Sequence, residues 1–237
     1  MVLSWSLDKL GPLCLTADDC GIVLEAIAGA DADDPSTSDR PYRYDIYAST
    51  GRRFKLAVIK DVTEGAQAEV AANFERALQA LEDVADIEEI EFPEMPYEAV
   101  TRTILNAESA SAFEEFIESG GDYIRALRIR GKVARIADEV MAGYDAVVGP
   151  TRPVTATPID QDFRGVVAGT ARDTMGAVGN SAGLPAISVP SGFSDEGLPT
   201  GVQFMGRAYD ENRILAVARA YQSMTDWHTQ HPPGLTA

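Results

Sequence analysis

A strand, a helix and a second strand follow one another between residues 54 and 92, and this order constrains the fold more than any other feature. The stretch Phe54–Ile59 is mostly apolar and includes residues that favour strands. Residues 64–81 repeat apolar side chains at helical spacing, and residues 87–92 form a second candidate strand. Because alternating strands and helices pack into layers, the order predicts an α/β fold.

Short apolar runs between residues 146 and 205 predict further strands. Residues 146–148 form one run, which Gly149 and Pro150 end, and residues 186–189 form another. A turn-rich stretch, 192–199, then precedes the alternating residues 200–205, so we expect a β-hairpin. Asp210 follows in a capping position and predicts the start of a last helix.

The remaining chain is predicted to be helix and loop within a single domain of residues 1–237. Thr16 stands three residues before Asp19, which is typical of a helix N-terminus, and Gly29 ends the apolar pattern that follows. We expect a long loop over residues 30–53 and a flexible tail over residues 226–237. Residues 99–143 predict a helical insertion that is broken at Gly120 and Gly121.

The charge balance excludes several classes of partner. The 237 residues contain 20 Lys+Arg against 37 Asp+Glu, a formal net charge of −17. Nucleic-acid binders and polybasic membrane-docking proteins both need basic surfaces, so we expect neither partner. No apolar run reaches the roughly 18 residues of a membrane span, and the first residues lack the features of a secretory signal. A cytoplasmic location is therefore expected.

One pattern suggests a nucleophile. Residues 179–183 fit G-x-S-x-G, the turn that presents the nucleophilic serine in α/β-hydrolases. That turn needs a strand before the serine and a helix after it, whereas Ser181 follows a helical segment and precedes a strand. The only histidines, His228 and His231, lie in the tail. We interpret Ser181 as part of a structural turn and keep an independent serine hydrolase as the less favoured alternative.

Neither the cysteines nor the histidines form a convincing metal site. Cys14 and Cys20 have a spacing typical of neither metal nor redox motifs, so buried free thiols are expected. His228 and His231 could share a helix face, but the following proline pair and the lack of a third ligand disfavour metal binding. Phosphate-binding glycine loops are also missing from the sequence. No metal and no cofactor are predicted.

Three regions, in order along the chain, resemble the amidase signature family. The first comprises SLDKLGPL at residues 6–13, TADD at 16–19, VLEAIAG at 23–29 and DDPSTS at 33–38. The second is YDAVVGPTRP at residues 144–153. The third comprises NSAGLPAISVPSG at residues 180–192 and GLPTGVQFMGR at 197–207. The middle of the chain, roughly residues 60–140, carries no distinctive motif.

The resemblance implies a fold and a chemistry. The fold is the C-terminal part of the amidase-signature fold, a mixed β-sheet flanked by helices, incomplete as an isolated chain. The family cleaves carboxamide C–N bonds with a serine nucleophile, a second serine in a cis peptide and a lysine. All three residues precede the matching region in the family, so we assign no catalytic residue here. Lys9 lies in a motif that follows the relay and receives no catalytic role.

The resemblance also implies substrate-binding residues that wall the acyl pocket. They are Pro150, Thr151, Asn180, Gly183, Leu184 and Pro185. Each has an alternative structural interpretation, because prolines and glycines end strands and turns, and asparagine satisfies local backbone groups. Both interpretations stay open from the sequence.

Two hypotheses for the whole chain follow. In the first, the chain is the C-terminal portion of an amidase-type hydrolase, inactive alone, which needs an N-terminal amidase half or self-association. Its substrate would be a small-molecule amide, bound only when the core is complete. Within this hypothesis, resemblance to the glutamine-hydrolysing subunit of tRNA-dependent amidotransferases stays open. In the second, the chain is a non-catalytic interaction or scaffold protein derived from an amidase.

Overall fold

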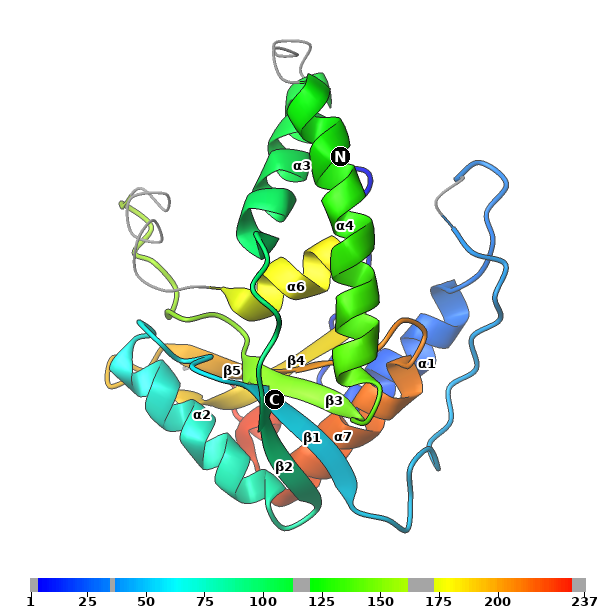
Figure 1. Cartoon of the computed structure of the whole chain (residues 1–237). Coiled ribbons are helices and arrows are strands. Elements are labelled where there is room, and N and C mark those ends of the chain that lie inside the picture. Colours follow the sequence, from blue (N-terminus) through cyan, green and yellow to red (C-terminus); the bar gives the residue numbers. More distant parts are fainter. Residues whose placement is uncertain (1–3, 35–36, 113–119, 162–172, 232–237) are drawn as a thin grey trace.

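The computed structural model describes residues 4–34, 37–112, 120–161 and 173–231 (Figure 1). The elements are, in chain order, α1 (Ala17–Ile27), β1 (Phe54–Ile59), α2 (Ala68–Leu81), β2 (Ala85–Ile90), α3 (Tyr97–Ala112), α4 (Gly120–Met141), β3 (Ala146–Pro150), α6 (Thr174–Ala182), β4 (Ala186–Phe193), β5 (Pro199–Met205), α7 (Glu211–Met224) and the 3₁₀ helix η1 (Trp227–Thr229). Among the described residues, no helix is both long and apolar enough to cross a lipid bilayer.

Five strands form one mixed sheet in the order β2-β1-β3-β5-β4. Strand β1 pairs in parallel with both β2 and β3, whereas β5 is antiparallel to both β3 and β4. The α/β class and the hairpin predicted from the sequence are therefore confirmed. Strand β4 lies at one edge of this sheet, and it contains Pro190, which has no N–H to donate.

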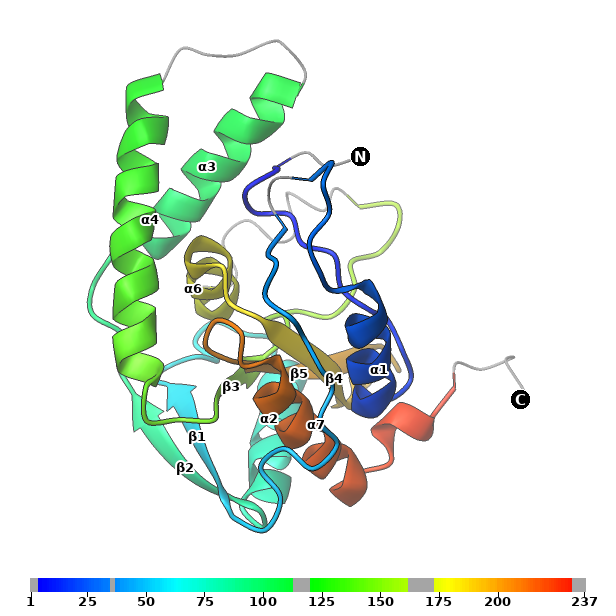
Figure 2. The ribbon, with the colours of Figure 1, turned by 90° about the vertical axis from the view of Figure 1, so that its right-hand side faces the viewer.

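Helices cover both faces of the sheet. Helices α2 and α7 lie on one face, and α6 and α4 on the other, with the α3–α4 pair projecting away from the sheet (Figures 1 and 2). Successive strand residues point to opposite faces, so Val148 packs toward α2 and α7 while Val147 packs toward α4 and α6. Strand β3 is consequently buried along its whole length.

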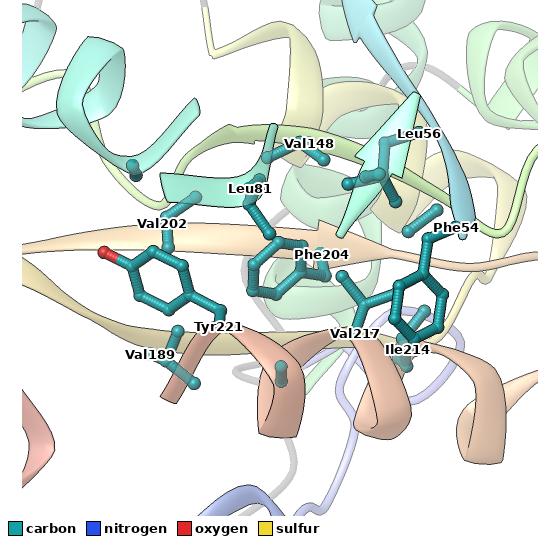
Figure 3. Packing of buried hydrophobic residues seen from close by; sticks show 14 of the residues in the cluster. Phe54, Leu56, Leu81, Val148, Val189, Val202, Phe204, Ile214, Val217 and Tyr221 are labelled. Atoms are coloured by element: carbon teal, nitrogen blue, oxygen red, sulfur yellow. The ribbon is translucent and has the colours of Figure 1, made fainter. Parts of the chain in front are cut away.

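The larger core cluster lies between the sheet and the helices α2 and α7. Phe204 from β5 is fully buried in it, with its ring centroid 6.1 Å from that of Tyr221 in α7 (Figure 3). A third, smaller cluster joins Leu7, near the N-terminus, to Val100 and Ile104 of α3 and Ala126 of α4. Residues 4–9, here called the N-terminal segment, are thus held against the projecting helices.

Several expected boundaries shift in the structure. Helix α2 begins at Ala68 rather than at residue 64, because residues 60–65 form turns with positive φ at Asp61 and Gly65. Strand β2 starts two residues earlier than expected, directly after the turn that ends α2. Strand β3 continues through Gly149 and Pro150, since both residues face β5 in register.

The predicted helical insertion and tail are described only in part. Residues 97–112 and 120–141 are helical, and the two glycines expected to break the insertion lie in the first turn of α4. Residues 113–119 lie outside the described ranges. Within the expected tail, residues 227–229 form η1, and residues 232–237 are likewise outside the described part.

The capping signal at Thr16 is confirmed. Its hydroxyl oxygen accepts a hydrogen bond from the Asp19 N–H at 3.1 Å, and α1 begins at the next residue, Ala17. The two cysteines are free, as predicted, but each is only partly buried. Partial burial and the neighbouring Cys14 raise the pKa of the Cys20 thiol to about 11.

Candidate functional site

A cavity of about 710 Å³ lies between the segment after β3, residues 151–161, and the β4–β5 hairpin. The segment leaves the end of β3 and passes beside β5 (Figure 1). Apolar side chains form much of the wall, among them Val70 of α2, Val154 and Val189. The volume falls in the range of small-molecule sites, about 300–1,000 Å³.

Two hydroxyl groups form a polar spot in this cavity. The Oγ1 atom of Thr151 and the Oγ atom of Ser188 are 2.6 Å apart and share a hydrogen bond. Gly201 lies beside them, and a Cβ atom there would come within 2.7 Å of Thr151 Oγ1. The missing side chain at Gly201 therefore leaves room for the pair, while the Thr151 N–H donates to the Gly201 carbonyl at 2.8 Å.

One charged side chain, Arg152, belongs to the described lining, and its charge is already paired. Its Nη1 atom lies 3.0 Å from Oδ2 of Asp173. Asp173 also caps α6, because its Oδ1 atom accepts the Gly176 N–H at 2.8 Å. The carboxylate thus serves both the arginine and the start of the helix.

Of the pocket-wall residues expected from the sequence, Thr151 lines this cavity, and Pro150 precedes it as a buried residue of β3. The remaining candidates are Asn180, Gly183, Leu184 and Pro185, at the opposite end of α6. A helix of this length separates its two ends by about 13 Å. The structure therefore divides the expected residues between two places.

The turn after α6 ends the helix. Gly183 adopts a positive φ of 71°, and its N–H donates to the Asn180 carbonyl. Leu184 packs into the core cluster beneath α4 and α6. The Asn180 side chain accepts a hydrogen bond from Lys9 Nζ at 3.3 Å, which brings the N-terminal segment to this turn. Partial burial and the nearby Arg130 lower the pKa of Lys9.

Ser181 lies in the interior at the end of α6. Its side chain is fully buried, and its hydroxyl donates to the Ala177 carbonyl at 2.6 Å. Helix α6 precedes it and strand β4 follows, the reverse of the order that a nucleophile turn requires. These contacts favour the structural interpretation of Ser181.

Two charged groups, Arg130 and Glu108, tie the N-terminal segment to α3, α4 and α6. Arg130 donates to the Ser6 hydroxyl at 3.0 Å, to the Ser6 carbonyl at 2.9 Å and to the Ser181 carbonyl at 3.0 Å. Glu108, which is buried, accepts the Ser4 hydroxyl at 2.6 Å and the Ser6 N–H at 3.1 Å. Burial alone raises the pKa of Glu108, but these bonds outweigh it and hold the pKa below its usual value.

No sequence signal predicts this network. Arg130 sits in a basic stretch of α4 that is typical of a solvated helix face, and Glu108 is one acid among many. Their partners in the N-terminal segment lie more than a hundred residues away along the chain. Local spacing therefore cannot connect them.

Replacing Arg130 with alanine is expected to release the N-terminal segment. The substitution removes three hydrogen bonds and leaves the Ser6 and Ser181 carbonyls without these donors. We expect deuterium uptake at residues 4–9 to rise roughly tenfold in rate and unfolding stability to fall by about 2 kcal/mol. Hydrogen-exchange mass spectrometry measures the first effect. Arg128→Ala, an exposed change on the same helix, should alter neither; equal uptake in both variants would contradict the anchoring role.

The histidines do not share a helix face. His228 belongs to η1, which ends at Thr229, and His231 lies beyond it. Within the described ranges, no group of three or more His, Cys, Asp or Glu side chains is arranged to hold a metal ion.

Known proteins share both the sequence pattern and the geometry. The sequence profile of the Amidase family matches residues 2–119 and 114–215. A glutamyl-tRNA(Gln) amidotransferase subunit from Roseiflexus sp. (strain RS-1) is 31% identical over 275 residues, which cover 96% of this chain and 56% of the relative. The same subunit from Geobacillus kaustophilus is also 31% identical, with 96% and 57% covered.

Solved structures show the same relationship. The corresponding amidotransferase subunit from Thermotoga maritima superposes with a TM-score of 0.80 and 32% identity, covering 92% of this chain and 53% of that protein. Native peptide amidase from Stenotrophomonas maltophilia gives a TM-score of 0.69 at 25% identity, covering 94% and 54%. The chain spans about half the length of the relatives it matches. Because the family profile covers most of its residues, this chain belongs to the amidase signature family.

Proposed function

We propose that this chain is the C-terminal portion of an amidase-type hydrolase that cleaves carboxamide C–N bonds. It supplies the scaffold and pocket walls, while an N-terminal amidase portion supplies the reacting serine and its proton acceptor. The observation that carries the proposal is the extent of the similarity to the Roseiflexus sp. (strain RS-1) subunit. It covers 96% of this chain but only 56% of that relative. The burial of Ser181 adds support, since its hydroxyl is already engaged by backbone carbonyls.

The proposed pocket walls come from two places that α6 connects. Thr151 forms the first wall, at the cavity, and Pro150 lies behind it in β3. The turn over residues 180–185 forms the second wall, at the other end of α6. On this proposal, Gly183, Leu184 and Pro185 hold the turn in shape, and Asn180 together with Lys9 faces the incoming portion. The contact between Lys9 and Asn180 supports this assignment, because it joins the turn to the segment nearest the proposed partner.

An exposed apolar stretch supports a partner at the N-terminal side. Residues 5–15, here called the N-terminal apolar segment, include Trp5 at 66% exposure, Leu10 at 98%, Leu13 at 100% and Leu15 at 69%. Several large, exposed apolar side chains within one short segment are typical of an interaction site. Strand β4 is an edge strand of the sheet, so a further strand could pair with it except at Pro190, which has no N–H to donate. We propose that the N-terminal amidase portion covers both surfaces.

Co-expression tests the proposal. The chain would be produced with the polypeptide encoded immediately upstream, and in parallel with the N-terminal portion of the Thermotoga maritima relative. Ammonia release would then be measured over a panel of aliphatic, aromatic and peptide-like amides. We expect a stable complex that hydrolyses at least one amide, and no turnover by the chain alone.

A matched variant separates the alternatives. Ser181→Ala should leave the activity of the complex within about twofold, because the hydroxyl makes only a local helix contact. Hydrolysis by the isolated chain that disappears with Ser181→Ala would instead establish an independent serine hydrolase. A complex that forms without hydrolysing any amide would favour a scaffold role, and self-association of the chain alone would displace the proposed partner.

A further inference from the structure

The two cysteines lie on either side of the start of α1. Cys14 belongs to the N-terminal apolar segment, between two exposed leucines, and Cys20 is the fourth residue of the helix. The hydroxyl of Thr16 caps α1 by accepting the Asp19 N–H at 3.1 Å. A residue before such a cap often packs against the fourth helical residue, which fixes the angle at which the chain enters the helix. The capped turn therefore brings the apolar segment against Cys20.

Two contacts place the thiols together. The Cys20 thiol donates a hydrogen bond to the Pro12 carbonyl, with Sγ and the oxygen 3.8 Å apart. The same thiol lies beside Cys14 and interacts with both its side chain and its backbone. Both thiols are free, and both side chains are partly exposed. Adjacent thiols that solvent reaches can be joined in a disulfide, although a spacing of six residues does not by itself indicate one.

We propose that Cys14 and Cys20 are a modification site at which a small-molecule disulfide, such as oxidised glutathione, generates a reversible intramolecular disulfide. Partly exposed disulfides are more easily reduced than buried structural ones, so the bond can be reversed. The new bond would replace a weak thiol hydrogen bond with a covalent link between the N-terminal apolar segment and α1. Oxidation would thereby restrict the motion of residues 10–16.

The oxidation proceeds by two thiol–disulfide exchanges. The Cys14 thiolate attacks one sulfur of oxidised glutathione and forms a mixed disulfide, and the first glutathione leaves and takes up the proton that Cys14 lost. The Cys20 thiolate then attacks the Cys14 sulfur, and the second glutathione leaves with the proton from Cys20. The protein loses two electrons and two protons, which reduce oxidised glutathione to two thiols. Cys20 receives the second step because burial and the hydrogen bond with the Cys14 thiol raise its pKa to about 11.

A titration of the 237-residue chain with mixtures of reduced and oxidised glutathione tests the proposal. Remaining thiols are alkylated, and mass spectrometry identifies the bond; with two cysteines in the sequence, an intramolecular disulfide can join only this pair. We expect an equilibrium constant for its formation roughly tenfold larger in native buffer than in unfolding urea, because the folded turn holds the thiols together. Deuterium uptake at residues 10–16 should slow about 3- to 10-fold on oxidation.

Variants separate the steps and the role of the turn. Cys20→Ser should stop at a mixed disulfide with one glutathione, and Cys14→Ser should form its mixed disulfide roughly tenfold more slowly. Thr16→Val removes the cap and should lower the native equilibrium constant about threefold or more, although both thiols remain. Thr50→Val, which removes an exposed local hydrogen bond elsewhere, should leave that constant unchanged.

Several results would overturn the proposal. These are the absence of an intramolecular disulfide at every glutathione ratio, equal equilibrium constants in native buffer and in urea, and disulfide-linked dimers in place of the intramolecular bond. Faster reaction of Cys14→Ser than of Cys20→Ser would contradict the assigned order of attack.

Discussion

Replacing Phe204 with alanine is expected to lower the free energy of unfolding by about 3–5 kcal/mol. The side chain is fully buried near the C-terminal end of β5, where Phe204 faces Val148 of β3 and Ile187 of β4 in register. Its ring packs beside Tyr221 of α7 (Figure 3). Truncation removes apolar contacts between the sheet and the helix layer and leaves a cavity that the surrounding strands cannot close.

Urea unfolding followed by circular dichroism measures this effect. Because domains of this kind are stable by only about 5–15 kcal/mol, the loss would remove much of the total. Phe193→Ala on the neighbouring strand is the matched control: that ring is 39% exposed and makes an edge contact with Trp227. We expect the control to cost about 1 kcal/mol. Similar losses of unfolding free energy in both variants would contradict the central place of Phe204 in the core.

Replacing Asp145 with asparagine is expected to lower the free energy of unfolding by about 2–3 kcal/mol. Both carboxylate oxygens accept hydrogen bonds from Arg52 at 2.7 Å, and Oδ2 also accepts the Lys55 N–H at 2.8 Å. Arg213 of α7 approaches to 3.5 Å. An asparagine would turn an N–H₂ donor toward these donors. The cost stays moderate because Arg52 and Arg213 are nearly half exposed and regain water.

The same carboxylate makes stability depend on pH. Burial alone raises the pKa of Asp145, but the hydrogen bonds from Arg52 and Lys55 outweigh it and hold the pKa below its usual value. The unfolded chain therefore binds a proton first as pH falls. The contribution of Asp145 is complete above the unfolded pKa of about 4, and it is lost as pH falls from there through the lower pKa of the folded state.

Unfolding free energies at pH 7 and at about pH 3 check this prediction. The difference in unfolding free energy between the native protein and Asp145→Asn should be smaller at about pH 3 than at pH 7. Asp86→Ala, which breaks an exposed pair with Arg53, should cost less than about 1 kcal/mol at neutral pH. A difference that stays constant over the whole acid range would contradict the assigned protonation behaviour.

Local elements could be predicted from the sequence because they depend on neighbours within a few residues. The Thr16 cap, the apolar pattern of α2 and the alternation of the hairpin are of this kind, and each appears in the structure. The boundaries that shifted lie where turns compete with helix, as at residues 60–65. The family resemblance likewise rested on short contiguous motifs, and the profile match supports it.

The assembly of these elements could be seen only in three dimensions. Strand β5 pairs between β3 and β4, Glu108 reaches Ser4 across 104 residues, and the expected pocket residues separate to opposite ends of α6. The cavity exists because the segment after β3 packs against the hairpin. Such contacts form between residues that are far apart in the sequence, when loops close and apolar surfaces are buried against one another. Residue spacing along the sequence does not specify which distant surfaces meet.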